Sequence, residues 1–93
     1  MARQLLLKER FRRAYDRLSP PDRERVKKSL RLLQDYVRTG EAPVGLGLKK
    51  LGPEVYEFRV GLALRGVYVE EGQDVIVSLL GSHDEVRRFL KRS

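Results

Sequence analysis

The sequence predicts an α+β fold, in which an N-terminal helical hairpin packs on a small, mostly antiparallel sheet of four to five strands, followed by a short C-terminal helix. Two observations predict it. Apolar residues recur with helical spacing up to about residue 38 and alternate with period two afterwards, and glycines at 52, 61, 72 and 81 divide the alternating part. The 93 residues contain no linker, repeat or low-complexity stretch, so we expect one domain over 1–93.

The first helix is predicted to begin at Glu9 and to end at Leu18. The segment before it, Gln4–Lys8, holds an apolar run too short to show a period, so strand and helix both remain open and we favour a strand. Four apolar residues of the helix fall at i, i+3, i+4 and i+7, which places them on one face: Phe11, Ala14, Tyr15 and Leu18.

A second helix is predicted from Pro20 to about Arg38, antiparallel to the first. Ser19 suits the N-cap position, and the charge of Asp22 suits the helix N-terminus. Gly40 suits a left-handed residue that ends the helix. The expected core stripe consists of Val26, Leu30, Leu33 and Val37, with Tyr36 alongside.

Strands are predicted near 46–51, 54–60, 63–70 and 74–80, followed by a helix from Asp84 to Lys91. The segment Glu70–Gln73 has the composition of a hairpin turn. The last strand is apolar on both faces, so it should be the most buried.

The positive charge lies in the first part of the chain. Residues 1–40 hold 12 Lys and Arg against 5 Asp and Glu, whereas residues 41–93 hold 8 of each. The positive electrostatic field of such a segment favours nucleic acid or a ribonucleoprotein as partner, with an acidic protein as the second choice. The excess of Arg over Lys, 14 to 6, also fits a bias of genome composition or a warm habitat.

The sequence lacks the residues that several kinds of chemistry require. The chain has no cysteine and one histidine, so we expect no disulfide, no thiolate nucleophile, no metal site and no cofactor. No apolar run approaches the roughly 18 residues that span a bilayer, so we expect a cytoplasmic protein without membrane contact. Walker loops, dinucleotide-binding glycine motifs and zinc-protease motifs are also absent from the sequence.

Candidate functional residues lie on the predicted strands. Strict alternation places Glu57 and Arg59 together on one face of the sheet. Two interpretations remain: a solvated face with a cross-strand ion pair, or a cleft that the two charged groups line. Arg65 interrupts an apolar strand, which is costly unless its head reaches solvent, a carboxylate or a phosphate. Gly66 beside it permits close backbone approach.

His83 follows the most buried strand, where a side chain is firmly held and reachable from solvent. An imidazole there suits proton transfer, although a lone histidine at a helix start is more often structural, and Ser82 competes as the cap. Lys49 and Lys50 fit an edge strand protected against pairing. The C-terminal helix carries cations that complement its dipole: Arg87, Arg88, Lys91 and Arg92.

The order of these motifs resembles the RelE/ParE toxin superfamily over nearly the whole chain. After the helical hairpin, the matching segments are Lys49–Gly52, Tyr56–Gly61, Leu64–Tyr68 and Gly81–His83. The resemblance implies a toxin of a type II toxin–antitoxin system, with helices on one face of the sheet and a basic concave cleft on the other. Members of the RelE type enter the ribosomal A site and cut mRNA without a metal, by attack of the 2′-hydroxyl on the adjacent phosphate.

The resemblance also implies roles for individual residues. Arg65 matches the arginine that contacts the scissile phosphate, and Arg59 matches a basic position on the preceding strand. His83 lies where relatives carry an arginine or, in the YafQ-like branch, a catalytic histidine, which implies a general acid or base. Glu57 stands where some members have lysine and is a candidate base. Further RNA contacts are expected from Lys49, Lys50, Arg87, Arg88 and Phe89.

Two departures from the family pattern concern catalysis. Several ribonuclease members have a tyrosine in the C-terminal helix, where this chain has Arg87, Arg88 and Phe89, and Glu57 reverses the charge of the lysine-bearing branch. The expected partners are a cognate antitoxin, the ribosome and mRNA, with a monomeric free toxin and a hetero-oligomer with antitoxin. Two alternatives remain: a ParE-like poison of DNA gyrase, and a catalytically weak protein that only binds its antitoxin.

Overall fold

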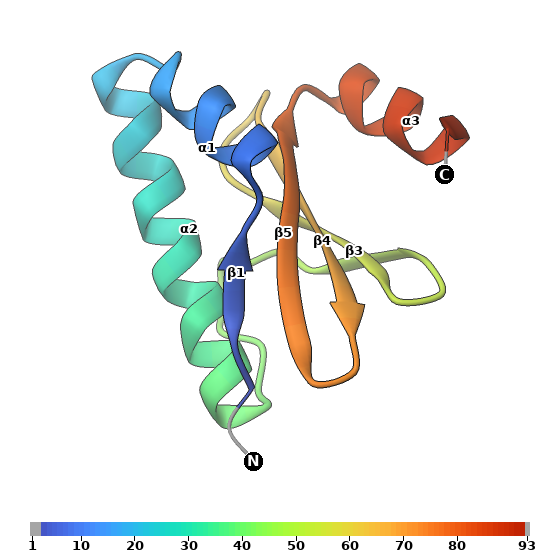
Figure 1. Cartoon of the computed structure of the whole chain (residues 1–93). Coiled ribbons are helices and arrows are strands. Elements are labelled where there is room, and N and C mark those ends of the chain that lie inside the picture. The colour runs from blue at the N-terminus through green and yellow to red at the C-terminus, as the bar shows by residue number, and fades with distance from the viewer. Residues whose placement is uncertain (1–2, 93) are drawn as a thin grey trace.

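The computed structural model describes residues 3–92 (Figure 1). In chain order the elements are β1 (Leu5–Leu7), α1 (Glu9–Asp16), α2 (Pro20–Thr39), β2 (Lys49–Gly52), β3 (Val55–Arg59), β4 (Arg65–Glu71), β5 (Asp74–Gly81) and α3 (His83–Arg92). The five strands form one mixed sheet in the order β1-β5-β4-β3-β2, in which β1 is parallel to β5 and every other neighbouring pair is antiparallel. The predicted α+β fold, with its N-terminal helix pair and short C-terminal helix, is confirmed.

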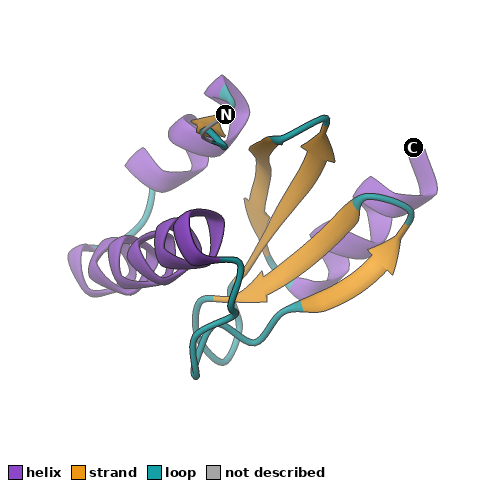
Figure 2. Ribbon diagram, turned by 90° about the horizontal axis from the view of Figure 1, so that it is seen from below, coloured by secondary structure: helices purple, strands orange, loops and turns teal. Residues whose placement is uncertain are grey.

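The two faces of the sheet are covered by different helices (Figure 2). On the first, which we call the α2 face, residues of α1 and α2 join the larger hydrophobic core. On the second, the α3 face, Val67 of β4 and Leu79 of β5 pack against Val86 of α3. This division decides which strand residues lie under each helix.

The ends of α2 form as the sequence predicts. The Ser19 hydroxyl accepts a hydrogen bond from the backbone N–H of Asp22 at 3.4 Å, and Gly40 adopts a left-handed φ of 81° at the C-cap. The buried stripe differs in one position. Leu30 is only half-buried, and Ser29 takes its place in the interior because its hydroxyl donates to the carbonyl of Arg59 at 3.1 Å.

The first helix is shorter than predicted and ends at Asp16. The backbone N–H groups of Arg17 and Leu18 donate to Ala14 and Tyr15, three residues back, so the last turn tightens and stops before Leu18. The C-terminal helix is longer than predicted. It begins at His83, because Ser82 is its cap, and it ends at Arg92.

The strand predicted at 46–51 begins only at Lys49. Gly45 and Gly47 adopt φ values of 95° and 61°, which an extended strand does not contain. Between them, Leu46 turns inward and is fully buried, and its carbonyl accepts a hydrogen bond from the N–H of Arg59 at 3.0 Å. The loop therefore runs beside the end of β3 without extending β2.

The strand β5 is apolar on both faces because helices cover both faces of the sheet, and a β-bulge divides it. Tyr68 pairs with Val77 and Val67 pairs with Leu79, so Ser78 is an extra residue, and its hydroxyl donates to the carbonyl of Ile76 at 3.1 Å. Beyond the bulge the alternation is shifted by one residue. Leu79 consequently packs on the α3 face, whereas Leu80 joins the core under α2.

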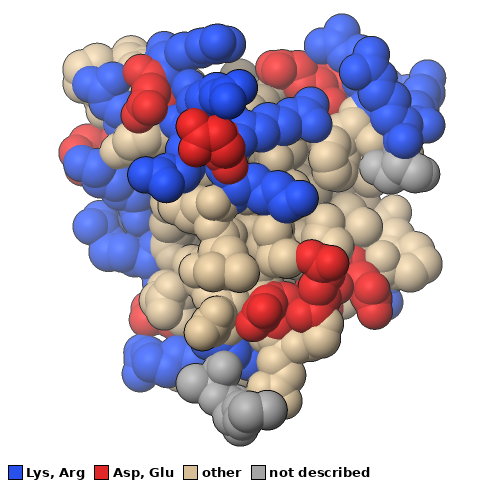
Figure 3. Space-filling view, viewed as in Figure 1, with Lys and Arg blue, Asp and Glu red and all other residues tan. Residues whose placement is uncertain are grey.

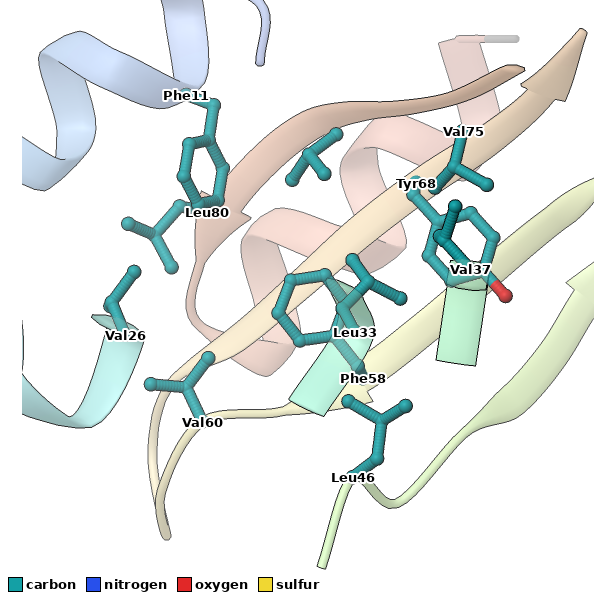
Figure 4. Close-up of a cluster of buried hydrophobic side chains, with 11 residues drawn as sticks. Phe11, Val26, Leu33, Val37, Leu46, Phe58, Val60, Tyr68, Val75 and Leu80 are labelled. Carbon is teal, nitrogen blue, oxygen red and sulfur yellow. The ribbon is translucent and has the colours of Figure 1, made fainter. Parts of the chain in front are cut away.

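The core on the α2 face is built around aromatic side chains (Figure 4). Phe11 of α1, Phe58 of β3 and Tyr68 of β4 are all almost completely buried. The Tyr68 ring stacks on Tyr56 with centroids 5.1 Å apart, and no described residue accepts a hydrogen bond from its hydroxyl. Burial raises the pKa of Tyr68 well above its usual value, with Tyr36 and Glu70 adding to the shift, so this tyrosine stays neutral.

Gly66 makes room for the ring of Phe58, its direct partner across β3 and β4. A Cβ atom at position 66 would lie 2.2 Å from the Phe58 Cζ atom, and the ring is fully buried and has no space to move into. We expect Gly66→Ala to lower the free energy of unfolding by about 3 kcal/mol in chemical denaturation. Gly52→Ala is the matched control, because a Cβ there meets nothing within 4 Å. Equal denaturation midpoints for the two variants would contradict this account of the core.

No helix within residues 3–92 is long and apolar enough to cross a membrane.

The ribbon in Figure 1 places the end of β5, α1 and α3 at one end of the molecule and the C-terminus of α2 at the other. The acidic β4–β5 turn lies away from the end that carries α1 and α3, as the space-filling view shows (Figure 3).

Candidate functional site

Two of the predicted site arginines are direct neighbours across β3 and β4. Arg59 is the last residue of β3, Arg65 is the first residue of β4, and they are Cα partners in the antiparallel ladder. Directly opposed residues project from the same face of a sheet, so both side chains leave the α3 face at one end of the strands. Two guanidinium groups therefore start from adjacent positions, although like charges opposite each other destabilise a sheet.

The Arg65 side chain is half-buried and held by the loop that precedes it. One guanidinium nitrogen donates to the carbonyl of Gly61 at 2.8 Å, which closes the connection between β3 and β4. No carboxylate in residues 3–92 pairs with this arginine within 4.0 Å. The guanidinium has five N–H donors, so the loop contact fixes the group and leaves donors for an anion.

The Arg59 backbone is fixed from two sides, while its side chain is exposed. Its N–H donates to Leu46 and its carbonyl accepts from the Ser29 hydroxyl, so both the 41–48 loop and α2 hold it. Within residues 3–92, its guanidinium forms no ion pair or hydrogen bond with another side chain. A rigid main chain with an unpaired cationic head suits the capture of a phosphate.

His83 lies at the start of α3, just after the strand residue that pairs with Arg65. Arg65 pairs with Gly81, the last residue of β5, and His83 follows two residues later. Ser82 and Glu85 form a reciprocal capping box. The backbone N–H of Ser82 donates to the Glu85 carboxylate at 3.0 Å, and the backbone N–H of Glu85 donates to the Ser82 hydroxyl at 3.2 Å. Ser82 caps the helix, so the His83 imidazole is not needed as a cap. The imidazole is exposed and forms no hydrogen bond or ion pair with another described side chain.

Glu57 lies on the same face as Arg59, two residues earlier on β3, and is half-buried between its neighbours Lys49 and Val67. The sequence left open a cross-strand ion pair at this position. In the part of the chain that the structure describes, no cation lies within 4.0 Å of the Glu57 carboxylate. The ion-pair interpretation is therefore wrong, and the carboxylate is available as an acceptor.

The expected RNA contacts do not all share this face. Lys49 is the partner of Glu57, but Lys50 is the partner of Tyr56, and its ammonium lies 5.9 Å from that ring's centroid on the opposite face. On α3, Phe89 packs on the Val67–Leu79 cluster, while Arg87 and Arg88 are exposed. Arg88 and Phe89 line one cavity together with Arg10 and Arg92, two arginines that the sequence analysis did not assign to RNA.

Residues 3–92 contain no group of three or more His, Asp or Glu side chains that could hold a metal ion. The groups at this end of the sheet are instead two guanidiniums, one imidazole and one carboxylate. Cationic groups stabilise charge that develops on a phosphate, and an imidazole or a carboxylate can move a proton. The arrangement suits reactions at a phosphodiester.

The fold defines a class of protein. Solved structures of RelE, YafQ and YoeB toxins share this fold, with helices on both faces of a five-stranded mixed sheet, over most of their length. The sequence itself matches no protein-family model and no curated protein. The fold that the resemblance implies is thus confirmed.

Three of these solved structures illustrate the likeness. A chain of the RelB–RelE antitoxin–toxin complex from Methanococcus jannaschii superposes with a TM-score of 0.69 and 16% identity, over 90% of this chain and 96% of that one. YafQ from E. coli strain BL21(DE3) gives 0.69 and 14%, over 90% and 97%. The YoeB/ParE toxin from Agrobacterium tumefaciens gives 0.65 and 22%, over 86% and 98%.

Proposed function

We propose that this chain is the toxin of a toxin–antitoxin pair and acts as a ribosome-dependent mRNA endoribonuclease. The observation that carries the proposal is the direct pairing of Arg59 with Arg65 at the end of the sheet where His83 begins α3. The RelE-like fold supports it, because proteins of that fold include RelE, YafQ and YoeB toxins.

The proposed reaction is an intramolecular transesterification of RNA. The 2′-hydroxyl loses its proton and its oxygen bonds to the adjacent phosphorus, while the bond from phosphorus to the 5′ oxygen breaks and that oxygen takes a proton. Arg59 and Arg65 stabilise the charge on the phosphorane. His83 moves one of the two protons, and Glu57 is the candidate for the other. The products are a 2′,3′-cyclic phosphate and a free 5′-hydroxyl.

The proposed partner is a cognate antitoxin. Solved complexes of the fold contain one, as in the RelB–RelE complex and the YoeB–YefM complex from Staphylococcus aureus. In this chain β1 lies at one edge of the described sheet, and Leu6 and Leu7 are 44% and 40% exposed there. An open edge with exposed leucines suits pairing with an amphipathic segment.

Primer extension on mRNA from a cell-free translation reaction tests the proposed activity. We expect discrete cuts at the ribosomal A site with the wild-type chain, and a loss of about two orders of magnitude in cleavage rate for Arg59→Ala. Arg38→Ala is the matched control, because Arg38 pairs with Asp35 at the C-terminal end of α2, far from the site, and should cut normally.

Two further arms separate the alternatives. The same mRNA without ribosomes shows whether cleavage needs translation, and a supercoiling assay with DNA gyrase tests the ParE-like alternative. Intact mRNA together with blocked supercoiling would replace the ribonuclease with a gyrase poison. Intact mRNA, normal supercoiling and a folded chain would leave antitoxin binding as the remaining activity.

A further inference from the structure

A cleft between α1 and α3 carries more positive charge than the fold needs. Two neighbouring cavities of about 320 and 330 Å³ lie there and share Arg10 and Glu85 as lining residues, and we call the two together the α1–α3 cleft. Five arginines line it: Arg10, Arg13 and the C-cap residue Arg17 of α1, and Arg88 and Arg92 of α3. Figure 3 shows Lys and Arg side chains gathered at this end of the molecule.

The arginines are arranged in two facing rows. Those of α1 recur at i, i+3 and i+7 and those of α3 at i and i+4, which places each set on one face of its helix. The guanidinium carbon of Arg10 lies 5.6 Å from the centroid of the Phe89 ring, so this side chain reaches from α1 to α3. The two rows therefore line one groove at the end of β5.

Carboxylates leave most of this charge uncompensated. Of the two acidic residues in the lining, Glu9 pairs with Arg13 at 3.6 Å, and Glu85 accepts the N–H of Ser82 in the capping box of α3. Among residues 3–92, no carboxylate lies within 4.0 Å of the other four arginines, which are Arg10, Arg17, Arg88 and Arg92.

Stability alone does not account for this arrangement. Arg88 and Arg92 complement the C-terminal end of the α3 dipole, but Arg10 is the second residue of α1, where the dipole disfavours a cation. Like charges collected around one groove also repel each other, most strongly at low salt. A multivalent anion bound in the groove would remove both costs.

The α3 helix connects the cleft to the proposed catalytic end. His83 begins the helix and Arg92 ends it, nine residues or about 14 Å further along. We propose that the α1–α3 cleft binds the sugar–phosphate backbone of the RNA strand next to the cleaved phosphodiester. The identity of the ligand rests on the proposed function, whereas the requirement for a row of phosphates rests on the spacing of the arginines.

Binding to a non-cleavable RNA tests the cleft independently of catalysis. The probe is a short, single-stranded 2′-O-methyl oligoribonucleotide, which lacks the attacking hydroxyl, and the readout is fluorescence anisotropy over a salt series. For Arg10→Gln, and for Arg88→Gln combined with Arg92→Gln, we expect affinity at 0.1 M salt to fall about fivefold per arginine. The slope of log affinity against log salt should fall by about 0.7 per arginine.

Arg31→Gln is the matched control, because Arg31 is an exposed arginine of α2 outside the cleft. It makes the same change in net charge and should lower affinity less than about twofold. The proposal is overturned if the cleft variants bind the probe as Arg31→Gln does, or if the wild-type chain does not bind it. The cleft variants are also measured for binding to polyglutamate. If they lose as much affinity for polyglutamate as for RNA, the proposal is overturned and an acidic protein segment becomes the ligand of the cleft.

The two proposals fail in distinguishable ways. If the chain leaves mRNA intact during translation but binds the probe through the cleft, the cleft proposal stands and the ribonuclease proposal fails. If the chain cuts mRNA at the A site but the cleft substitutions do not change probe binding, the ribonuclease proposal stands and the cleft proposal fails. The melting temperature of Arg10→Gln, measured at low salt, should equal or exceed that of the wild type, because the substitution removes a charge that the α1 dipole disfavours and that the other arginines repel.

Discussion

Replacing His83 with glutamine should lower the rate of mRNA cleavage by about 10²–10⁴-fold and leave the fold unchanged. Glutamine retains hydrogen-bonding groups and similar size but cannot take up and release a proton near neutral pH. The imidazole is exposed at the first position of α3, and Ser82 caps the helix without it, so stability should change by less than about 0.5 kcal/mol. Single-turnover cleavage on programmed ribosomes, with thermal unfolding alongside, measures both quantities.

Asp84→Asn is the matched control for His83→Gln, since Asp84 is the next exposed residue of α3 and its side chain has no role in the proposed proton transfer. It should retain near-normal cleavage. Wild-type cleavage by His83→Gln would refute the assignment of this histidine. A large loss with Glu57→Gln in the same series would then move the proton transfer to that carboxylate.

Arg65→Ala is expected to lower cleavage by about 10²–10³-fold, because it removes a donor aimed at the developing phosphorane charge. It also removes the hydrogen bond from the guanidinium to the Gly61 carbonyl, which is half-buried, so a loss of about 1 kcal/mol in the free energy of unfolding should accompany it. Rates are therefore compared well below both melting temperatures. Toxicity on expression in a bacterial host provides a second readout.

Arg65→Lys separates charge from geometry at this position. Lysine retains the positive charge but lacks the planar fork that both holds the Gly61 carbonyl and presents donors to a phosphate, so it should recover only part of the lost rate. Undiminished growth arrest by a folded Arg65→Ala variant would show that this arginine has a structural role only, as the clamp of the β3–β4 connection.

Most of the elements follow from local patterns in the sequence. The caps at Ser19 and Gly40 delimit α2, and period-two alternation on β3 separates Phe58 from Glu57 and Arg59. These signals depend on neighbours within a few residues, so they survive in any fold the chain adopts. Boundaries were less predictable where a tertiary contact intervened, as at Leu46, which is drawn into the core and delays the start of β2.

The candidate site depends on long-range pairing to a greater extent. The sequence identified Arg59, Arg65, Glu57 and His83 as candidates, but their proximity depends on which strands pair and in which register. A shift of the β3–β4 register by two residues would leave the buried face unchanged but separate the two arginines, and no local signal excludes that shift. Of the arginines in the α1–α3 cleft, the sequence indicated only Arg88 as an RNA contact, because Arg10 belongs to the polar face of a short helix.

By itself, the sequence determined the element types, the caps and the excess of positive charge, and it supplied the candidate residues for the proposed reaction. Tertiary structure alone decided the parallel pairing of β1 with β5, the bulge at Ser78 and the docking of α3 beside α1. The physical reason is the range of the interactions. Helix and strand periodicity is set by residues a few positions apart, whereas strand order, register and helix docking are set by the packing of segments distant in the chain.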